Sequence, residues 1–267
     1  MRQRPTVTAL TAEAGVSEGP AEALAPAMGE SCWLESPDLS VEEQLALDEA
    51  LLDEAERGLR SERTVRTWMA GELAVVVGSS SRLDTEVDLA ACRADGVRVV
   101  RRPSGGATVV LGPGCLMWTV VTPYPDGVPS VDTLHAAALD PLCRQFATAG
   151  LAVTRQGTSD LTLGDRKVSG NALRVRRHAV LYHGTLLDAF DIARAMRLLK
   201  HPPREPSYRE HRPHTSFLTN LGLGRERLEQ LVRDAFAAGA EAKACDPATT
   251  QRLLTERYRS AAWNERL

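Results

Sequence analysis

The stretch Val99–Gly114, VVRRPSGGATVVLGPG, constrains the fold more than any other part of the sequence. A β-branched run ends at two arginines, a glycine turn follows, and a second β-branched run begins at once, which predicts strand, turn, strand. Gly105 and Gly106 carry no side chain, so backbone N–H groups of the turn can approach an anion. Arg101 and Arg102 should point to opposite faces of the strand, and we expect one of them at a carboxylate or phosphate. Taken alone, the stretch also fits a plain glycine hairpin with two surface arginines.

The overall composition limits the partners and the compartment. The 267 residues carry 32 basic and 35 acidic side chains, a net charge of −3, which predicts neither a nucleic-acid nor a membrane partner. The five cysteines form no CxxC pair, so we expect a reducing, cytoplasmic setting and no structural zinc site. Residues 1–30 contain little large apolar content and predict a disordered extension. Residues 31–267 show no linker or repeat, which predicts a single domain.

The first confident element is a helix that begins after Ser40. Ser40 and Glu43 form a capping-box pattern, in which each side chain can bind one free N–H group at the helix start. Asp48 lies on the apolar stripe of this helix. We expect its carboxylate to be held by a core arginine or by backbone N–H groups, or else to orient one of the paired arginines of the glycine turn.

Hydrophobic patterns and turn residues predict the remaining elements. They are a strand pair over residues 64–69 and 74–77 with its turn at Ala70-Gly71, a helix from Ser130 that Pro141 should kink or split, a hairpin with its turn at Gly164-Asp165, strands over residues 171–175 and 180–187, and helices over residues 225–238 and from Asp246.

A second cluster with chemical promise lies in Gly164–Ala172, GDRKVSGNA. Lys167 is followed by Ser-Gly, so its ammonium can sit beside a closely approaching backbone. Asp160 begins the same hairpin and can accept a hydrogen bond from a nucleotide or help to hold a metal, and His183 lies in the next strand. Taken singly, each of the three fits a structural role better: a snorkelling lysine, a capping aspartate and a surface histidine.

The segment His201–His214, HPPREPSYREHRPH, is rich in proline, arginine and histidine. Such a segment forms either a lid over a site or a solvated connector between two elements. The sequence leaves these two interpretations equally open.

Four motifs occur in a defined order, namely RRPSGG, SDL, GDRKVSGNA and HGTLL. In this order, and with QLALDEALL and TNLG on either side, the chain resembles the lipoate–protein ligase A family, whose close relatives are octanoyltransferases. The resemblance implies an α+β fold of the biotin/lipoate ligase, class II synthetase-like type, with a mixed central β-sheet flanked by helices. It also implies a two-step reaction. Lipoate or octanoate attacks the α-phosphate of ATP to give an acyl-adenylate, and a lysine of a lipoyl domain then takes the acyl group.

The resemblance further implies site residues, cofactors and partners. Lys167 is the expected catalytic residue, because its charge can bridge the carboxylate and the phosphate. Asp160 is expected to contact the nucleotide or Mg²⁺. The residues expected to bind ATP and the lipoyl-adenylate are Arg102, Ser104, Gly105, Gly106, Ala107, Thr108, Val109, Val110, Asp160, Ser169, Gly170, Ala172 and His183. The implied partners are lipoyl domains of 2-oxoacid dehydrogenase complexes or the glycine cleavage H protein. A separate accessory subunit also fits, because we expect no C-terminal accessory domain in this chain.

Four positions depart from the usual family pattern. Ala107 stands for a third glycine, Leu111-Gly112 for a His-Asp pair, and Cys115 for a residue that is commonly asparagine. Two alternatives to a ligase therefore stay open: an ATP-independent octanoyl or lipoyl transferase, and a non-catalytic lipoate- or adenylate-binding protein. The transferase relatives hold the acyl group on a cysteine, which lies shortly before the SDL-like segment or after the HGT-like segment. Neither position has a cysteine here, so Cys115 is the remaining candidate, or else a buried strand thiol.

Overall fold

The computed structural model describes residues 30–266, so all but the last residue of the expected N-terminal extension lies outside the described residues. The larger of two sheets has eight strands in the order β11-β1-β2-β6-β10-β9-β8-β7. The pairs β1–β11 and β1–β2 are parallel and the other pairs are antiparallel, so the sheet is mixed. Its strands are β1 (Ser31–Trp33), β2 (Arg63–Met69), β6 (Cys115–Pro123), β7 (Val153–Gln156), β8 (Asp160–Leu163), β9 (Arg166–Val175), β10 (Ala179–Leu187) and β11 (Ala240–Glu241).

A second sheet has three strands, with β3 (Ala74–Val77) between β4 (Arg98–Arg101) and β5 (Val109–Leu111). The two strands that flank the glycine turn are therefore not hairpin partners, because β4 runs parallel and β5 antiparallel to the strand between them. The predicted pairing of β2 with β3 is wrong, since the two strands belong to different sheets. All four residues of β3 are buried, which suits a central strand, and a uniformly apolar run does not encode its neighbours.

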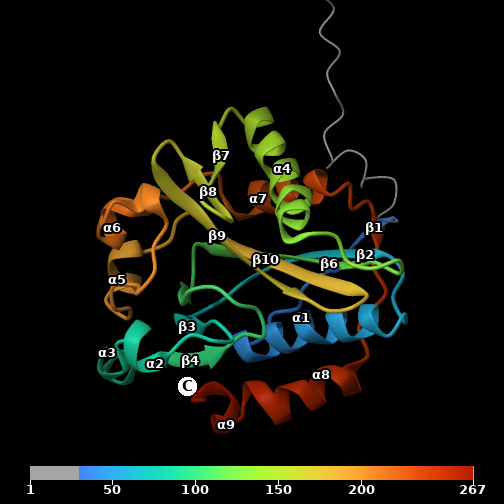
Figure 1. Ribbon diagram of the computed structural model, residues 1–267, viewed down its shortest axis with the longest axis horizontal. Helices are drawn as coiled ribbons and strands as arrows, with labels where there is room; N and C mark the ends of the chain where they lie inside the picture. Colours follow the sequence, from blue (N-terminus) through green and yellow to red (C-terminus); the bar gives the residue numbers. More distant parts are fainter. Residues whose placement is uncertain (1–29, 267) are drawn as a thin grey trace, which may run out of the picture.

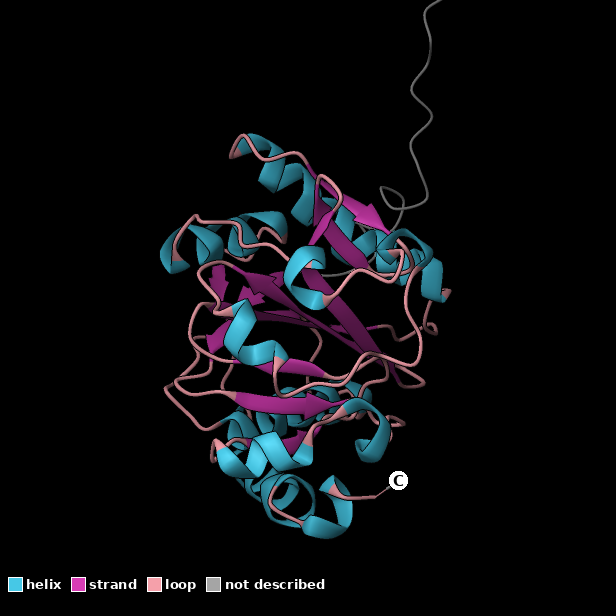
Figure 2. Cartoon of the chain, turned by 90° about the vertical axis from the view of Figure 1, so that its left-hand side faces the viewer, coloured by secondary structure: helices cyan, strands magenta, loops and turns pink. Residues whose placement is uncertain are grey.

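Helices cover both faces of the larger sheet, so the expected mixed central sheet flanked by helices is confirmed (Figures 1 and 2). Helices α4 and α7 lie on one face, and α1, the smaller sheet and the C-terminal helices lie on the other (Figure 1). The helices are α1 (Val41–Glu56), α2 (Leu83–Glu86), α3 (Leu89–Ala94), α4 (Val131–Thr148), α5 (Ile192–Met196), α6 (His214–Phe217), α7 (Arg225–Ala235), α8 (Pro247–Leu253) and α9 (Ala261–Asn264). Among the described residues, no helix combines the length and the apolar character needed to cross a membrane.

Two local predictions about helices have different outcomes. The capping box at the start of α1 is confirmed, because Ser40 Oγ accepts from the N–H of Glu43 and the Glu43 carboxylate accepts from the N–H of Ser40. Helix α4, by contrast, runs unbroken through Pro141, so the predicted split does not occur. Leu139 and Phe146 are buried on either side of the proline, and their packing outweighs a cost of about 3 kcal/mol for an interior proline.

Candidate active site

A cavity of about 140 Å³ opens where β5, β9 and β10 approach the segment that contains α5 and α6. One part of its lining is apolar and includes Val110, Leu187, Phe190, Met196, Leu199 and Phe217. The other part is polar and carries Lys167, Ser169, Thr185, Arg204, Arg209 and His214. An apolar hollow next to cationic groups matches an amphiphilic acid, whose chain is buried while its carboxylate meets the cations.

The cavity joins the two stretches that the sequence singles out. Ala107, Thr108, Val109 and Val110 line it from the glycine turn and β5, and Lys167, Ser169 and Gly170 line it from β9. The remaining predicted residues do not line the cavity: Arg102, Ser104, Gly105, Gly106, Asp160, Ala172 and His183. Some of these seven contact a lining residue directly: Asp160 pairs with Lys167, and Arg102 donates to the carbonyl oxygen of Ala107.

Lys167 is held by an acidic partner from the neighbouring strand. Its Nζ lies 2.7 Å from Oδ1 of Asp160, and Oδ2 of Asp160 accepts a hydrogen bond of 2.7 Å from the hydroxyl of Tyr208. Burial and the Asp160 charge raise the pKa of Tyr208, so this hydroxyl keeps its proton. At Gly170, a Cβ atom would lie only 2.9 Å from the Lys167 Nζ. Because Gly170 has no side chain, the Lys167 ammonium can occupy the space beside it.

Both oxygens of the Asp160 carboxylate therefore already have a partner within the protein. One oxygen faces an ammonium and the other accepts from a phenol, whereas a magnesium ligand offers a free carboxylate oxygen. A carboxylate paired at both oxygens in this way does not fit a preformed Mg²⁺ site on Asp160.

The guanidinium of Arg102 is turned toward its own loop. It donates to Ser104 Oγ (3.0 Å) and to the carbonyl oxygens of Val76 (3.1 Å), Gly105 (2.6 Å) and Ala107 (2.9 Å). Burial lowers the pKa of Arg102 to about 10, which still leaves it charged at neutral pH. Arg102 therefore stabilises the glycine turn through these hydrogen bonds and does not line the cavity.

The two adjacent arginines serve different parts of the molecule, as alternation along a strand predicts. Arg101 donates to the carbonyl oxygens of Gly78, Ser81 and Arg266, so it ties β4 to the C-terminal segment.

The glycine turn itself requires glycine at Gly106. A Cβ atom on Gly106 would lie 3.1 Å from Nη2 of Arg102. Gly106 also has a φ of 86°, so both its close approach and its backbone conformation require glycine.

A buried chain of polar groups connects the glycine turn to the larger sheet and to α1. Ser104 Oγ and His183 Nε2 share a hydrogen bond of 2.6 Å, and His183 Nδ1 faces Asp48 Oδ2 at 3.6 Å. Asp48 also pairs with Arg66 at 2.6 Å and accepts from the Thr119 hydroxyl at 3.0 Å. The expectation that a core arginine holds Asp48 is confirmed. All five side chains are buried, so they fix the position of the turn rather than contact solvent.

Two contributors near the cavity have no local signal in the sequence. The carboxylate of Glu86 accepts from the N–H (2.8 Å) and the hydroxyl (2.7 Å) of Thr108. It therefore takes one of the N–H groups that we expected to face an anionic ligand. Arg209 lines the cavity, is only 4% exposed, and has an Nη2 with no hydrogen-bond partner among the described residues. A buried, unmatched donor of this kind favours an anion in the cavity.

The segment His201–His214 forms a wall of the cavity through Pro202, Arg204, Pro206 and Arg209, which favours the lid over the connector. It is attached to the site by the Tyr208–Asp160 hydrogen bond and by an ion pair between Arg212 and Asp165. At its end, His214 also lines the cavity. Burial, with the charges of Arg209 and Lys167 nearby, lowers the pKa of His214 to about 4, so its imidazole is neutral at pH 7.

Of the residues that depart from the family pattern, Ala107 lines the cavity, whereas Leu111, Gly112 and Cys115 do not. Leu111 is fully buried in β5, and a Cβ atom on Gly112 would lie 2.6 Å from Leu73. Cys115 is fully buried as well, does not line the cavity, and has a thiol pKa that burial raises to about 12. A thiol with so high a pKa is a poor nucleophile at neutral pH.

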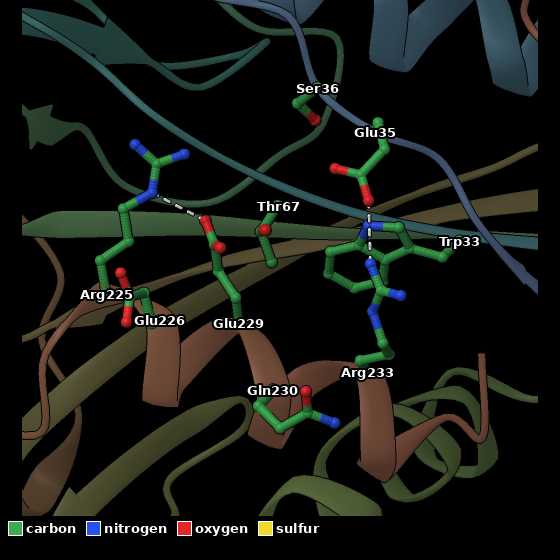
Figure 3. A pocket seen from close by; sticks show the side chains of 9 residues that line it. All are labelled: Trp33, Glu35, Ser36, Thr67, Arg225, Glu226, Glu229, Gln230 and Arg233. Carbon is green, nitrogen blue, oxygen red and sulfur yellow. Dashed lines mark hydrogen bonds and ion pairs between the residues drawn. The ribbon is translucent and has the colours of Figure 1, made fainter. Parts of the chain in front are cut away.

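A second hollow, of about 210 Å³, lies elsewhere, between α7 and strands β1 and β2 (Figure 3). Its lining is mainly polar, with Arg233 paired to Glu35 and stacked over the Trp33 ring, and Arg225 paired to Glu229. None of the residues that line it belongs to the four motifs. The chemistry of the motifs therefore centres on the smaller, amphiphilic cavity.

Comparison with known proteins agrees with this assignment. Residues 40–238 match the family described as the lipoyl protein ligase A/B catalytic domain. The octanoyltransferase LipM of Symbiobacterium thermophilum is 32% identical over 247 residues, which cover 82% of this chain and 88% of that protein. A putative lipoate-protein ligase A of Aeropyrum pernix is 35% identical over 156 residues, which cover 58% of this chain and 56% of that protein. The chain thus spans little more than half the length of this second relative.

Two solved structures share the fold. A bipartite lipoate protein ligase of Thermoplasma acidophilum, described together with its E2 lipoyl domain, matches with a TM-score of 0.76, 19% identity, and coverage of 89% of this chain and 96% of that chain. A lipoate-protein ligase A bound with ATP matches with a TM-score of 0.72, 21% identity, and coverage of 89% and 98%. With the family match over most of its length, the chain belongs to the lipoyl protein ligase A/B catalytic domain family.

Proposed function

We propose that this chain is a lipoate–protein ligase. In the first step it activates lipoate, or octanoate, with ATP to an acyl-adenylate. In the second step it transfers the acyl group to a lysine of a lipoyl domain. The observation that carries the proposal is the cavity itself, in which an apolar hollow meets Lys167, Arg209 and the end of the glycine turn.

The first step brings two anions together. An oxygen of the acyl carboxylate attacks the α-phosphorus of ATP, the bond to the β-phosphate oxygen breaks, and pyrophosphate leaves. Negative charge grows on the α-phosphate, so fixed cations and N–H groups should supply most of the catalysis. Lys167 can serve both anions once it exchanges Asp160 for the substrates, and Asp160 keeps its hydrogen bond from Tyr208 meanwhile.

The second step needs a lysine from a partner. Its neutral amine attacks the acyl carbonyl, an amide forms, and AMP leaves with the electron pair of the broken acyl–phosphate bond. The Thermoplasma acidophilum structure pairs a ligase of this fold with its E2 lipoyl domain, which supports a lipoyl domain as partner here. The same structure is of a bipartite ligase, which supports a separate accessory subunit for this chain. ATP would bring its Mg²⁺ on its own phosphates.

An ATP-independent acyltransferase is the second candidate, and the 32% identity to LipM favours it. Such an enzyme needs a cysteine that can form and release a thioester at the site. No cysteine lines the cavity within residues 30–266, and the thiol of Cys115 is buried with a raised pKa. This distribution of cysteines supports the ligase over the transferase.

The test offers the purified chain two donors in parallel, with an apo lipoyl domain as acceptor. One reaction contains lipoate and ATP, and the other contains an octanoyl–carrier protein thioester without nucleotide. Ready-made lipoyl-adenylate serves as a third donor, which isolates the second step. We expect acylation of the acceptor with lipoate and ATP and with the adenylate, and none with the thioester. Modification by the thioester alone would establish the transferase instead. Tight lipoate binding with no acylation from any donor would leave a binding protein.

A further inference from the structure

We propose that His201, Glu205 and His211 form a zinc-type metal site on the segment that walls the cavity. One ring nitrogen of each histidine and one carboxylate oxygen of Glu205 all lie within 4.8 Å of one another. The expectation of no structural zinc site came from the cysteine pattern, and this site uses imidazole and carboxylate ligands instead.

One of the two distances between ligand atoms matches the spacing around a tetrahedral ion. With metal–ligand bonds of about 2.0–2.2 Å, neighbouring ligand atoms of such an ion lie about 3.3–3.5 Å apart. His201 Nε2 lies 3.3 Å from Glu205 Oε2, and His211 Nδ1 lies 2.5 Å from Glu205 Oε1. The second pair is too close for two ligands of one ion, and the 89% exposed side chain of His211 is free to rotate outward by the difference.

The Glu205 carboxylate has an oxygen, Oε2, that accepts no hydrogen bond from any described residue and lies 3.3 Å from His201 Nε2. This oxygen is buried and forms an ion pair of 3.4 Å with Arg209 Nε. The carboxylate faces two imidazoles, and a divalent cation could be bound by all three groups at once.

The backbone brings the third ligand into place. Glu210 and His211 both have positive φ values, 51° and 58°, which turn the chain back toward Glu205. The N–H of His211 then donates to Glu205 Oε1 at 3.1 Å. His201 and His211 are 53% and 89% exposed in their side chains, so a metal can enter from solvent and a water can complete the shell.

The site also bears on the cavity, because the same segment lines it through Pro202, Arg204, Pro206 and Arg209. A metal that joins residue 201 to residue 211 would close the segment into a ring of fixed shape. We therefore expect the metal to hold this wall in the arrangement described here.

The experiment titrates Zn²⁺ into the full chain by calorimetry, beside His201→Ala, Glu205→Gln and His211→Ala. His178→Ala is the matched control, because His178 lies between β9 and β10, away from the cluster. We expect one Zn²⁺ per chain, at least tenfold weaker affinity in each cluster variant, and unchanged affinity in His178→Ala. Equal affinity in all variants, or no stoichiometric binding, would overturn the proposal.

Two further measurements, a Co²⁺ spectrum and the rate of tryptic cleavage, test whether these three residues bind the metal. Co²⁺ in place of Zn²⁺ should give a visible spectrum of nitrogen and oxygen ligation that disappears in His211→Ala. A thiolate-to-metal charge-transfer band would place the ion on cysteine and contradict the assignment. Zn²⁺ should also slow tryptic cleavage after Arg204 and Arg209 in the natural chain and leave the cleavage rate of His211→Ala unchanged. Equal protection of both chains would rule out the metal-closed segment.

Discussion

The Lys167 ammonium and the Asp160 carboxylate form an ion pair of 2.7 Å at the edge of the cavity, on neighbouring strands of one hairpin. The pair is three-quarters or more buried on both sides, so it is screened less than a surface pair. It sets the place from which Lys167 reaches a substrate. The ion pair thus holds the Lys167 ammonium, the proposed catalytic cation, in place before substrates bind.

Asp160→Asn should lower the turnover number about tenfold and leave the free energy of unfolding within about 1 kcal/mol of the natural chain. The amide still accepts from Tyr208, but it no longer attracts the ammonium, so Lys167 spends less time at the cavity edge. Steady-state acylation of a lipoyl domain and urea denaturation measure the two quantities. A variant with unchanged turnover would show that the pair does not position Lys167.

Gly170→Ala should impair activity without unfolding the protein. The new methyl group would lie 2.9 Å from Nζ and 3.0 Å from Cε of Lys167, so the tip of the lysine must move out of the cavity. Gly71→Ala is the matched control, because a Cβ atom there meets nothing within 4 Å. We expect at least a tenfold loss of kcat/KM in the first variant and none in the second. An equal effect of both substitutions would contradict the role assigned to Gly170.

Cys115→Ala should keep its acyl-transfer activity. The thiol is buried in β6 and its pKa is raised to about 12, so it takes no part in the proposed chemistry. Removing it should cost about 1 kcal/mol of stability, as for a small core truncation. Thermal denaturation and the acylation assay measure the two effects. Complete loss of acylation by a folded Cys115→Ala protein would point to a thioester mechanism.

His214 should make the protein less stable in mild acid. Its pKa is about 4 in the folded chain against 6.5 for an unperturbed histidine, so the unfolded chain binds the extra proton first. The contribution of this group to stability is complete above pH 6.5 and is lost as the pH falls toward 4. After allowance for solvent screening, the change amounts to about 1 kcal/mol. Urea denaturation of His214→Gln across this range should show a correspondingly smaller slope, and an identical slope would remove His214 as the cause.

The sequence predicts those parts of the site that neighbouring residues encode. The turn before Val110 and the hairpin that carries Lys167 are contiguous motifs, and both are found on one cavity. The buried Asp48 was predictable as well, because a carboxylate on an apolar helix stripe requires a partner. In each case the residues of one short stretch are enough to predict the local structure or the need for a partner.

The rest depends on contacts between distant segments. Glu86 reaches Thr108 from a separate helix. Tyr208 reaches Asp160, and Arg209 reaches the cavity, from a segment about 40 residues beyond Lys167. The failed pairing of β2 with β3 has the same origin, since strand partners are chosen by tertiary packing and not by the run of apolar residues. No local pattern records such contacts.

The most direct test of the central claim is the exchange of radioactive pyrophosphate into ATP by the purified chain, with and without lipoate. It reports the first step alone, at the atoms where Lys167 is proposed to act. We predict exchange that requires lipoate, a loss on the order of 10²-fold or more in Lys167→Met, as for removal of one stabilising donor, and no loss in the exposed control Lys243→Met. Lipoate-dependent exchange that survives intact in a folded Lys167→Met protein would contradict the account.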